Sequence, residues 1–160
     1  MKTKKLMSIL VLIVIIAFAW GTYNIALKDF RLTDTNYTYL GGLTWYHSAS
    51  GLNKGLQDAQ KENKPVLMYF WAVWCQYCAE FDANTLGNPQ VKNILQSDYV
   101  LVAMDLDVDK DVANTYRVSY PPYVIFMDPK GNVLERVTGY VGPDSFLPMV
   151  KQIRDKVRSK

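Results

Sequence analysis

Two cysteines three positions apart are the residues of this 160-residue sequence best suited to do chemistry. They lie in the run Trp74-Cys75-Gln76-Tyr77-Cys78, which follows an apolar stretch and leads into a segment with helical spacing. The N–H groups and the dipole at a helix N-terminus favour the thiolate form of a cysteine placed there. We therefore expect Cys75 to be the nucleophile and Cys78, one helical turn further on, to be the thiol that resolves a mixed disulfide.

The pair has two other interpretations, a structural disulfide and part of a metal site. A disulfide between residues so close in sequence closes a very small loop, so it would constrain the unfolded chain little. Two cysteines and one histidine, His47, are too few for a four-ligand zinc site. We therefore predict no metal and, because the chain carries no flavin or nicotinamide motif, no cofactor. A C-x-x-C beside a βαβ pattern favours redox exchange instead.

The elements around the pair predict an α/β fold. Residues 66–71, just before the cysteines, are apolar without alternation, which is typical of a strand buried on both faces. Further strands are predicted at 99–104, 123–127 and 133–137, the last two forming a hairpin across turn residues 128–132. Helices are predicted before the first strand, over the cysteines, after the second strand and at the carboxy terminus. This order indicates a sandwich with a mixed sheet of about four strands flanked by helices.

The charge balance argues against nucleic acid as a partner. The formal net charge is +3, from 18 basic and 15 acidic residues. Lys2, Lys4 and Lys5 account for this surplus, so residues 6–160 are neutral as a whole. Nucleic-acid-binding domains carry a net basic patch, and the folded part has no surplus from which to form one.

The amino-terminal segment is expected to enter a membrane. Residues 6–20 are apolar and uncharged, and the apolar character continues to residue 27. A spanning helix needs ~17–25 residues, whereas a cleaved signal peptide needs a shorter apolar stretch and a small-x-small site such as Ala17-Phe18-Ala19. The length of the run and the positions of Trp20 and Tyr23 favour an uncleaved anchor, with cleavage after Ala19 as the alternative.

Both alternatives export the rest of the chain. We predict a membrane anchor or signal peptide over residues 1–27, a linker over 28–42 that ends in two glycines, and a folded domain over 43–160. With an anchor, the lysine-rich start stays in the cytoplasm and the domain of a single-pass protein faces the periplasm or the cell exterior. With cleavage, the domain is periplasmic or secreted.

Several short blocks of the sequence share the pattern of one protein family. These blocks are residues 70–78 around the cysteines, Pro122 before the third strand, residues 137–140 after the fourth, and shorter matches at Lys64-Pro65-Val66, Glu80-Phe81-Asp82, Asn84-Thr85-Leu86, Pro89-Gln90-Val91 and Arg136-Val137-Thr138-Gly139. Over about residues 43–158 the chain resembles the thioredoxin superfamily. Within it, the chain is most similar to the carboxy-terminal periplasmic domain of the thiol:disulfide interchange protein DsbD. That full protein also has a membrane domain and an amino-terminal domain, so we expect a stand-alone relative on a single anchor.

The resemblance implies a thioredoxin-like sandwich in which Pro122 is a cis-proline facing the two cysteines. A cis bond between Tyr120 and Pro121 is the alternative. Pro122 would then shape a substrate groove, rimmed by Trp74, where a substrate strand pairs with the backbone of the preceding residue. Pro121 departs from the family pattern because it has no N–H, so one hydrogen bond to the substrate cannot form and only the carbonyl can accept. We expect a weaker or different grip on the substrate.

Two further residues bear on the proton of Cys78. Tyr69 stands where the family usually buries an acidic residue below the second cysteine. Asp82, four residues after Cys78, matches a second acidic position of the DsbD-like domain, and it is our candidate acceptor for the proton of the resolving thiol. The alternative is that Asp82 is a solvated charge on the helix surface.

These features predict an exported, membrane-tethered thiol:disulfide oxidoreductase. The resemblance favours reduction of disulfides in exported proteins, including apocytochrome c before haem attachment, with electrons from a membrane donor. An oxidase or isomerase using a membrane acceptor is the alternative within the same chemistry, because Gln76-Tyr77 is not the Gly-Pro of reducing thioredoxins. From another class, the fold could serve a metallochaperone or a non-catalytic binding module. Copper delivery of the thioredoxin-like kind needs a further histidine, and none follows Cys75.

Overall fold

The structure, a computed structural model, describes residues 15–16 and 39–159. Ile15 and Ile16 are helical, and the rest of the predicted anchor and most of the predicted linker lie outside the described residues. A compact unit extends from Thr38 to Lys160. Within the described ranges, no helix combines the length and the apolar character that crossing a membrane requires.

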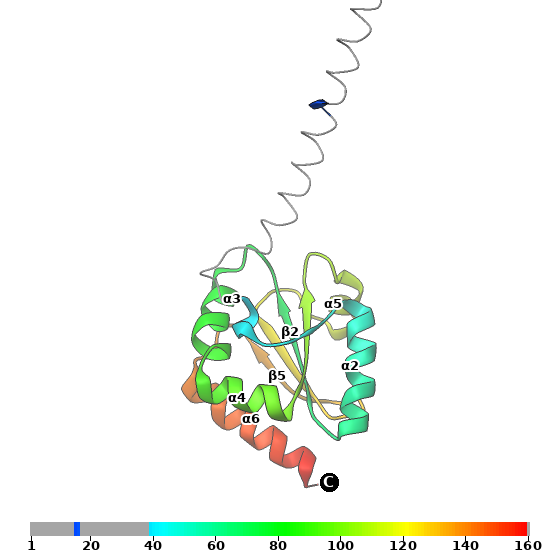
Figure 1. Cartoon of the computed structure of the whole chain (residues 1–160), viewed down its shortest axis with the longest axis vertical. Coiled ribbons are helices and arrows are strands. Elements are labelled where there is room, and N and C mark those ends of the chain that lie inside the picture. Colours follow the sequence, from blue (N-terminus) through cyan, green and yellow to red (C-terminus); the bar gives the residue numbers. More distant parts are fainter. Residues whose placement is uncertain (1–14, 17–38, 160) are drawn as a thin grey trace, which may run out of the picture. The chain divides into compact units, whose positions relative to one another are not determined.

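A five-stranded mixed sheet forms the centre of the compact unit (Figure 1). Its strands lie in the order β1 (Tyr46–His47), β3 (Val100–Asp105), β2 (Val66–Trp71), β4 (Tyr123–Met127) and β5 (Val133–Thr138). β3 pairs in parallel with β1 and β2, whereas β4 is antiparallel to both β2 and β5. The predicted mixed sheet is confirmed, and β1 is an additional strand. Its two residues are too few to produce a recognisable period in the sequence.

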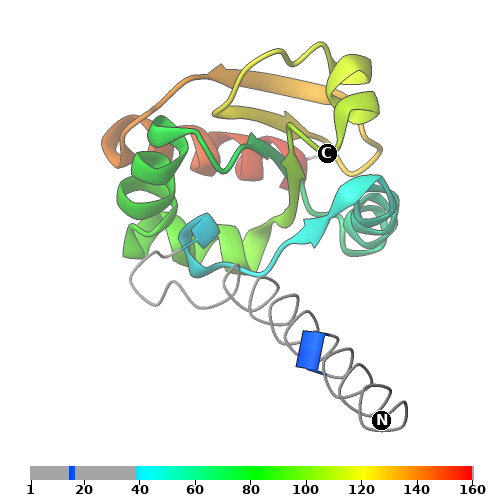
Figure 2. The same cartoon turned by 90° about the horizontal axis from the view of Figure 1, so that it is seen from above.

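Helices cover both faces of the sheet (Figure 2). One face packs against α2 and α5, and the other packs against α3, α4, α6 and a π-helical segment, η2. Their bounds are α2 (Ser48–Glu62), α3 (Gln76–Glu80), η2 (Phe81–Leu86), α4 (Pro89–Asp98), α5 (Lys110–Tyr116) and α6 (Pro143–Arg158). The sequence analysis did not single out α4. The residue that marks the start of α4 in the sequence is the N-cap Asn88. Its Oδ1 accepts hydrogen bonds from the N–H groups of Gln90 and Val91 in the first turn of the helix.

The central strand β2 joins the two cores because all six of its residues are buried. Tyr69 and its alternate neighbours face the core beneath α3 and α6, and the residues between them face α2. An aromatic series runs behind the cysteines, with ring centroids 5.4 Å apart for Tyr69 and Phe81 and 5.3 Å apart for Phe81 and Phe146. Phe126 of β4 extends it at 5.8 Å from Phe146. These aromatic contacts therefore hold the segment that follows the cysteines against the sheet.

The folded domain begins upstream of the boundary predicted at Leu43. A short turn, η1 (Tyr39–Gly42), precedes β1, and its Leu40 side chain is buried in the core beneath α3. Leu40 and Gly41 both have positive φ, +51° and +66°, so the paired glycines belong to a left-handed turn. The sequence analysis took the same glycines as the end of a linker, because a glycine pair alone does not distinguish a packed turn from a flexible one.

Candidate active site

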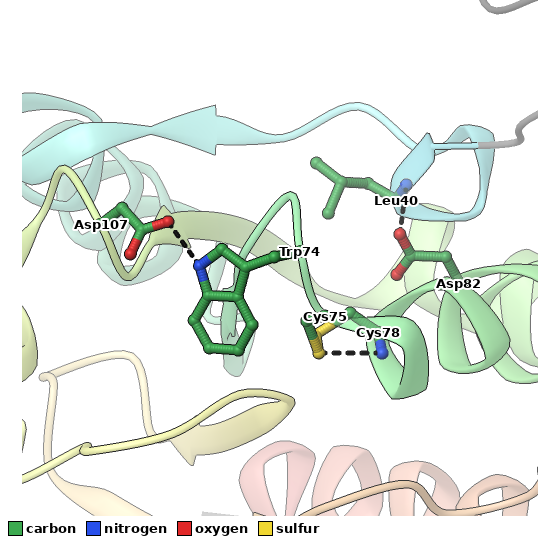
Figure 3. The surroundings of a disulfide bond; sticks show 6 residues. All are labelled: Leu40, Trp74, Cys75, Cys78, Asp82 and Asp107. Atoms are coloured by element: carbon green, nitrogen blue, oxygen red, sulfur yellow. Dashed lines mark hydrogen bonds between the residues drawn. A yellow bond between two sulfur atoms is a disulfide. The ribbon is translucent and has the colours of Figure 1, made fainter.

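The two cysteines lie at the end of β2, where the chain turns into α3. The structure joins them in a disulfide with an S–S distance of 2.09 Å and a Cα–Cα distance of 5.2 Å (Figure 3). Cys75 is the N-cap of α3, and its carbonyl accepts a hydrogen bond from the N–H of Ala79 at 3.2 Å. The pair therefore occupies the N-terminal turn of the helix, where the sequence analysis expected it.

The environments of the two sulfurs differ in two ways. Cys75 is 8% exposed and Cys78 is 2% exposed, so a partner would meet Cys75 first. The N–H of Cys78 also points at Sγ of Cys75, 3.1 Å away. An N–H donor at this place stabilises negative charge on the sulfur once the disulfide is reduced. This asymmetry fits an outer attacking thiol and an inner resolving thiol.

Pro121 and Pro122 precede β4, at the end of the sheet where β2 leads into the segment with the cysteines. The peptide bond between them is cis, as the resemblance implies. Phe70 of β2 pairs with Tyr123 of β4, so the two prolines continue β4 alongside the chain that leads to Cys75. The carbonyl of Pro122 already accepts the N–H of Gly139 at 2.9 Å. Because neither proline has an N–H, the half-exposed Pro121 offers only its carbonyl to a partner.

Trp74 directly precedes Cys75, and its position is set by a partner far away in the sequence. Its side chain is 65% exposed, and its Nε1–H donates to Oδ2 of Asp107 at 2.8 Å (Figure 3). The N–H of Asp107 donates in turn to Oδ1 of Asp105, at the end of β3. Sequence reasoning missed this link, because 33 positions separate Trp74 from Asp107 and no local pattern connects them.

Exposed apolar side chains gather at this same end of the sheet. They come from the turns after β2 and β3, from α3, from the approach to β4 and from the chain after β5, which the strand directions bring to one end of the sheet. The members are Val73, Trp74, Tyr77, Val108, Tyr120 and Tyr140. We call this set the apolar rim. Such a surface is suited to contact another polypeptide.

Tyr69 and Asp82 are both buried. Tyr69 packs its ring against Trp45 and Phe81, so an aromatic side chain fills the place of the acid usual in the family. Asp82 is 1% exposed, which overturns the alternative of a solvated helix charge. Its Oδ2 accepts the N–H of Leu40 at 3.0 Å. Asp82 is the one buried carboxylate among residues 39–159, and it lies in η2 one helical turn after Cys78.

The described residues contain no group of three or more His, Cys, Asp or Glu side chains able to hold a metal ion. His47, the histidine considered above, lies in β1 and is exposed. The cysteines are paired with each other. The disulfide itself supports exchange of the Cys75–Cys78 bond with another thiol or disulfide.

Comparison with known proteins agrees with this chemistry. The thioredoxin-like domain family matches residues 52–154. The thiol:disulfide interchange protein DsbD of Pseudomonas fluorescens is 29% identical over 118 residues, which cover 70% of this chain and 20% of that protein. DsbD of Salmonella typhi is 35% identical over 101 residues, which cover 59% of this chain and 17% of that protein. The chain thus spans about a fifth of the length of these curated relatives.

Solved structures show the same likeness. The oxidised carboxy-terminal domain of Neisseria meningitidis DsbD superposes with a TM-score of 0.58 and 25% identity, over 68% of this chain and 98% of that domain. A thioredoxin from Thermus thermophilus superposes with a TM-score of 0.61 and 27% identity, over 69% of this chain and 86% of that one. The resemblance recognised in the sequence is confirmed by both comparisons.

Proposed function

The chain belongs to the thioredoxin-like domain family and is a protein-disulfide oxidoreductase of that family, and we propose that it reduces disulfide bonds of exported proteins through Cys75 and Cys78. The observation that carries the proposal is the disulfide at the N-terminus of α3, with an outer Cys75 and an inner Cys78. The likeness to the carboxy-terminal domain of DsbD supports reduction as the direction. Electrons would then come from a donor in the membrane.

The first step is attack by the Cys75 thiolate on one sulfur of a client disulfide. A bond forms between Sγ of Cys75 and that sulfur, the client S–S bond breaks, and the second client sulfur leaves as a thiolate that takes a proton from water. The N–H of Cys78 and the start of α3 stabilise the attacking charge.

The second step releases the client. Cys78 gives its proton to the carboxylate of Asp82, and its thiolate attacks Sγ of Cys75. The Cys75–Cys78 bond forms, and the bond between Cys75 and the client breaks. The client sulfur leaves as a thiolate, so the client has gained two electrons and the protein has lost two. A dithiol donor must reduce the protein before another cycle.

The apolar rim and the carbonyl of Pro121 suit an extended client segment with apolar side chains near its cysteine. The segment would donate one backbone N–H to Pro121 in the groove shaped by Pro122, and Trp74 would cover it from the rim. Apocytochrome c before haem attachment, which carries cysteines in an unfolded chain, is a client of this kind. The proposal places the domain outside the cytoplasm, tethered through residues 6–27.

Trapping of mixed disulfides tests the exchange itself. A full-length Cys78→Ser chain, expressed in cells, should accumulate mixed disulfides with exported proteins that dissolve on reduction, because the resolving thiol is gone. The Cys75→Ser chain is the matched control and should trap none. Equal binding by the two variants without any disulfide-linked species would refute catalysis and favour a non-catalytic binding module or a metallochaperone.

The reduction potential of the Cys75–Cys78 couple tests the direction. We expect a value near or below about −220 mV for the full chain in thiol buffers, which suits a reductase. A value near about −120 mV would make the protein a disulfide donor and establish the oxidase alternative.

A further inference from the structure

The turn η1 reaches the active site through one buried hydrogen bond. The backbone N–H of Leu40 donates to Oδ2 of Asp82 at 3.0 Å, although the two residues are 42 positions apart (Figure 3). Burial disfavours an ionised carboxylate, whereas a hydrogen bond from an N–H group stabilises it. The backbone of Leu40 therefore acts on the same side chain that is proposed to take the proton of Cys78.

The position of this N–H is fixed by three contacts of the turn. The Leu40 side chain is 2% exposed and packs in the core beneath α3. The indole Nε1–H of Trp45 donates to the Leu40 carbonyl at 3.0 Å. Gly41 lies so close to η2 that a Cβ atom there would be 2.5 Å from Cβ of Leu86. A shift of the turn would therefore disturb buried packing as well as the bond to Asp82.

The carboxylate of Asp82 is buried, and the N–H of Leu40 is one identified source of its stabilisation.

We propose that η1 is a positioning element of the active site, in which the Leu40 N–H keeps the Asp82 carboxylate ionised and oriented to receive the proton of Cys78. Gly41 and Trp45 hold the turn in place for this task. The inference rests on the proposed role of Asp82 in the release step. It adds that residues upstream of β1, outside the segment that carries the cysteines, control the rate of that step.

Single-turnover reaction of the reduced full-length chain with 5,5′-dithiobis(2-nitrobenzoate) isolates the release step. Cys75 takes one thionitrobenzoate group and liberates the other, and Cys78 then expels the bound group, so the second release is followed by absorbance. In Gly41→Ala the turn must move. We expect the second release to slow roughly tenfold near neutral pH, which is the loss of a hydrogen bond to a charged group. The midpoint of its pH profile should rise by about one unit.

Trp45→Phe is the milder variant, because it removes the bond to the Leu40 carbonyl but keeps an aromatic ring beside Tyr69 and leaves the backbone of the turn unchanged. It should change the release rate in the same direction by a smaller factor, and it decides the question if Gly41→Ala does not fold. Leu52→Ala is the matched control. It opens a cavity in the core on the opposite face of the sheet and should leave the pH midpoint unchanged.

A double-mutant cycle with Asp82→Asn separates this inference from the proposed function. Asp82→Asn alone should slow the second release, and adding Gly41→Ala should then slow it no more than Leu52→Ala does. An unchanged rate in Asp82→Asn would refute the proton role of Asp82. Two outcomes would refute the role of η1 when Asp82→Asn itself is slow. In the first, Gly41→Ala and Trp45→Phe slow the second release no more than Leu52→Ala does. In the second, they slow it by the same factor in the Asp82→Asn chain as in the chain that retains Asp82.

Discussion

Restoring the missing backbone donor at position 121 should strengthen the grip on a client peptide. Pro121 and Pro122 have no N–H groups, and the next residue, Tyr123, lies in the sheet between Phe70 and Thr138. Pro121→Ala adds one N–H and leaves the carbonyl in place. A neutral hydrogen bond contributes ~0.5–1.5 kcal/mol, which corresponds to about a 2- to 13-fold change in an equilibrium constant.

The assay is an exchange equilibrium in the Cys78→Ser chain, where a mixed disulfide at Cys75 cannot be resolved. A peptide with apolar residues beside its cysteine competes with 2-mercaptoethanol, which forms the same bond but has no peptide groups. The exchange constant therefore measures the noncovalent contribution of the groove. We expect Pro121→Ala to shift it toward the peptide by the factor given above.

Pro129→Ala is the matched control, because it makes the same substitution in the turn between β4 and β5, at the opposite end of β4. It accounts for the general effect of replacing a proline on the unfolded chain. An exchange constant for Pro121→Ala equal to that of Pro129→Ala, or one shifted toward 2-mercaptoethanol, would refute the account of the groove.

Three further predictions concern the frame of the site. Phe146→Ala should lower the free energy of unfolding by ~3–5 kcal/mol in urea titrations, because Phe146 is fully buried between Phe81 and Phe126, and a loss below about 1 kcal/mol would contradict this packing. Asp107→Ala should lower the free energy of unfolding by less than about 1 kcal/mol, because its bond to Trp74 is exposed. The same substitution should shift the exchange constant at Cys75 away from the peptide. An unchanged exchange constant would show that the orientation of Trp74 does not affect client binding. Burial raises the pKa of the Tyr99 phenol well above its ordinary value near 10, so its contribution to stability is complete below about pH 10 and is lost as the pH rises further. Urea midpoints should therefore fall more steeply above pH 10 in the wild type than in Tyr99→Phe, and parallel curves would be evidence against this linkage.

Local chemistry made much of the site predictable. The spacing of Cys75 and Cys78 after an unbroken apolar strand was sufficient to indicate a redox pair at a helix N-terminus, because strand and helix periods are properties of short segments. The role of Pro122 before the third strand, by contrast, was implied by the resemblance to the thioredoxin superfamily. The bounds of β2 and β4 also followed from apolar runs and turn residues that act within a few positions.

Long-range contacts were decided by the tertiary structure alone. Trp74 meets Asp107 and Leu40 meets Asp82 across 33 and 42 positions, and nothing in the intervening sequence specifies either bond. Asp82 illustrates the difference most directly. The sequence shows that Asp82 lies one helical turn after Cys78, but it is compatible with either a solvated or a buried carboxylate. Burial depends on how η1, η2 and the sheet pack together, because the exposure of a side chain is a property of its neighbours in space rather than in the chain.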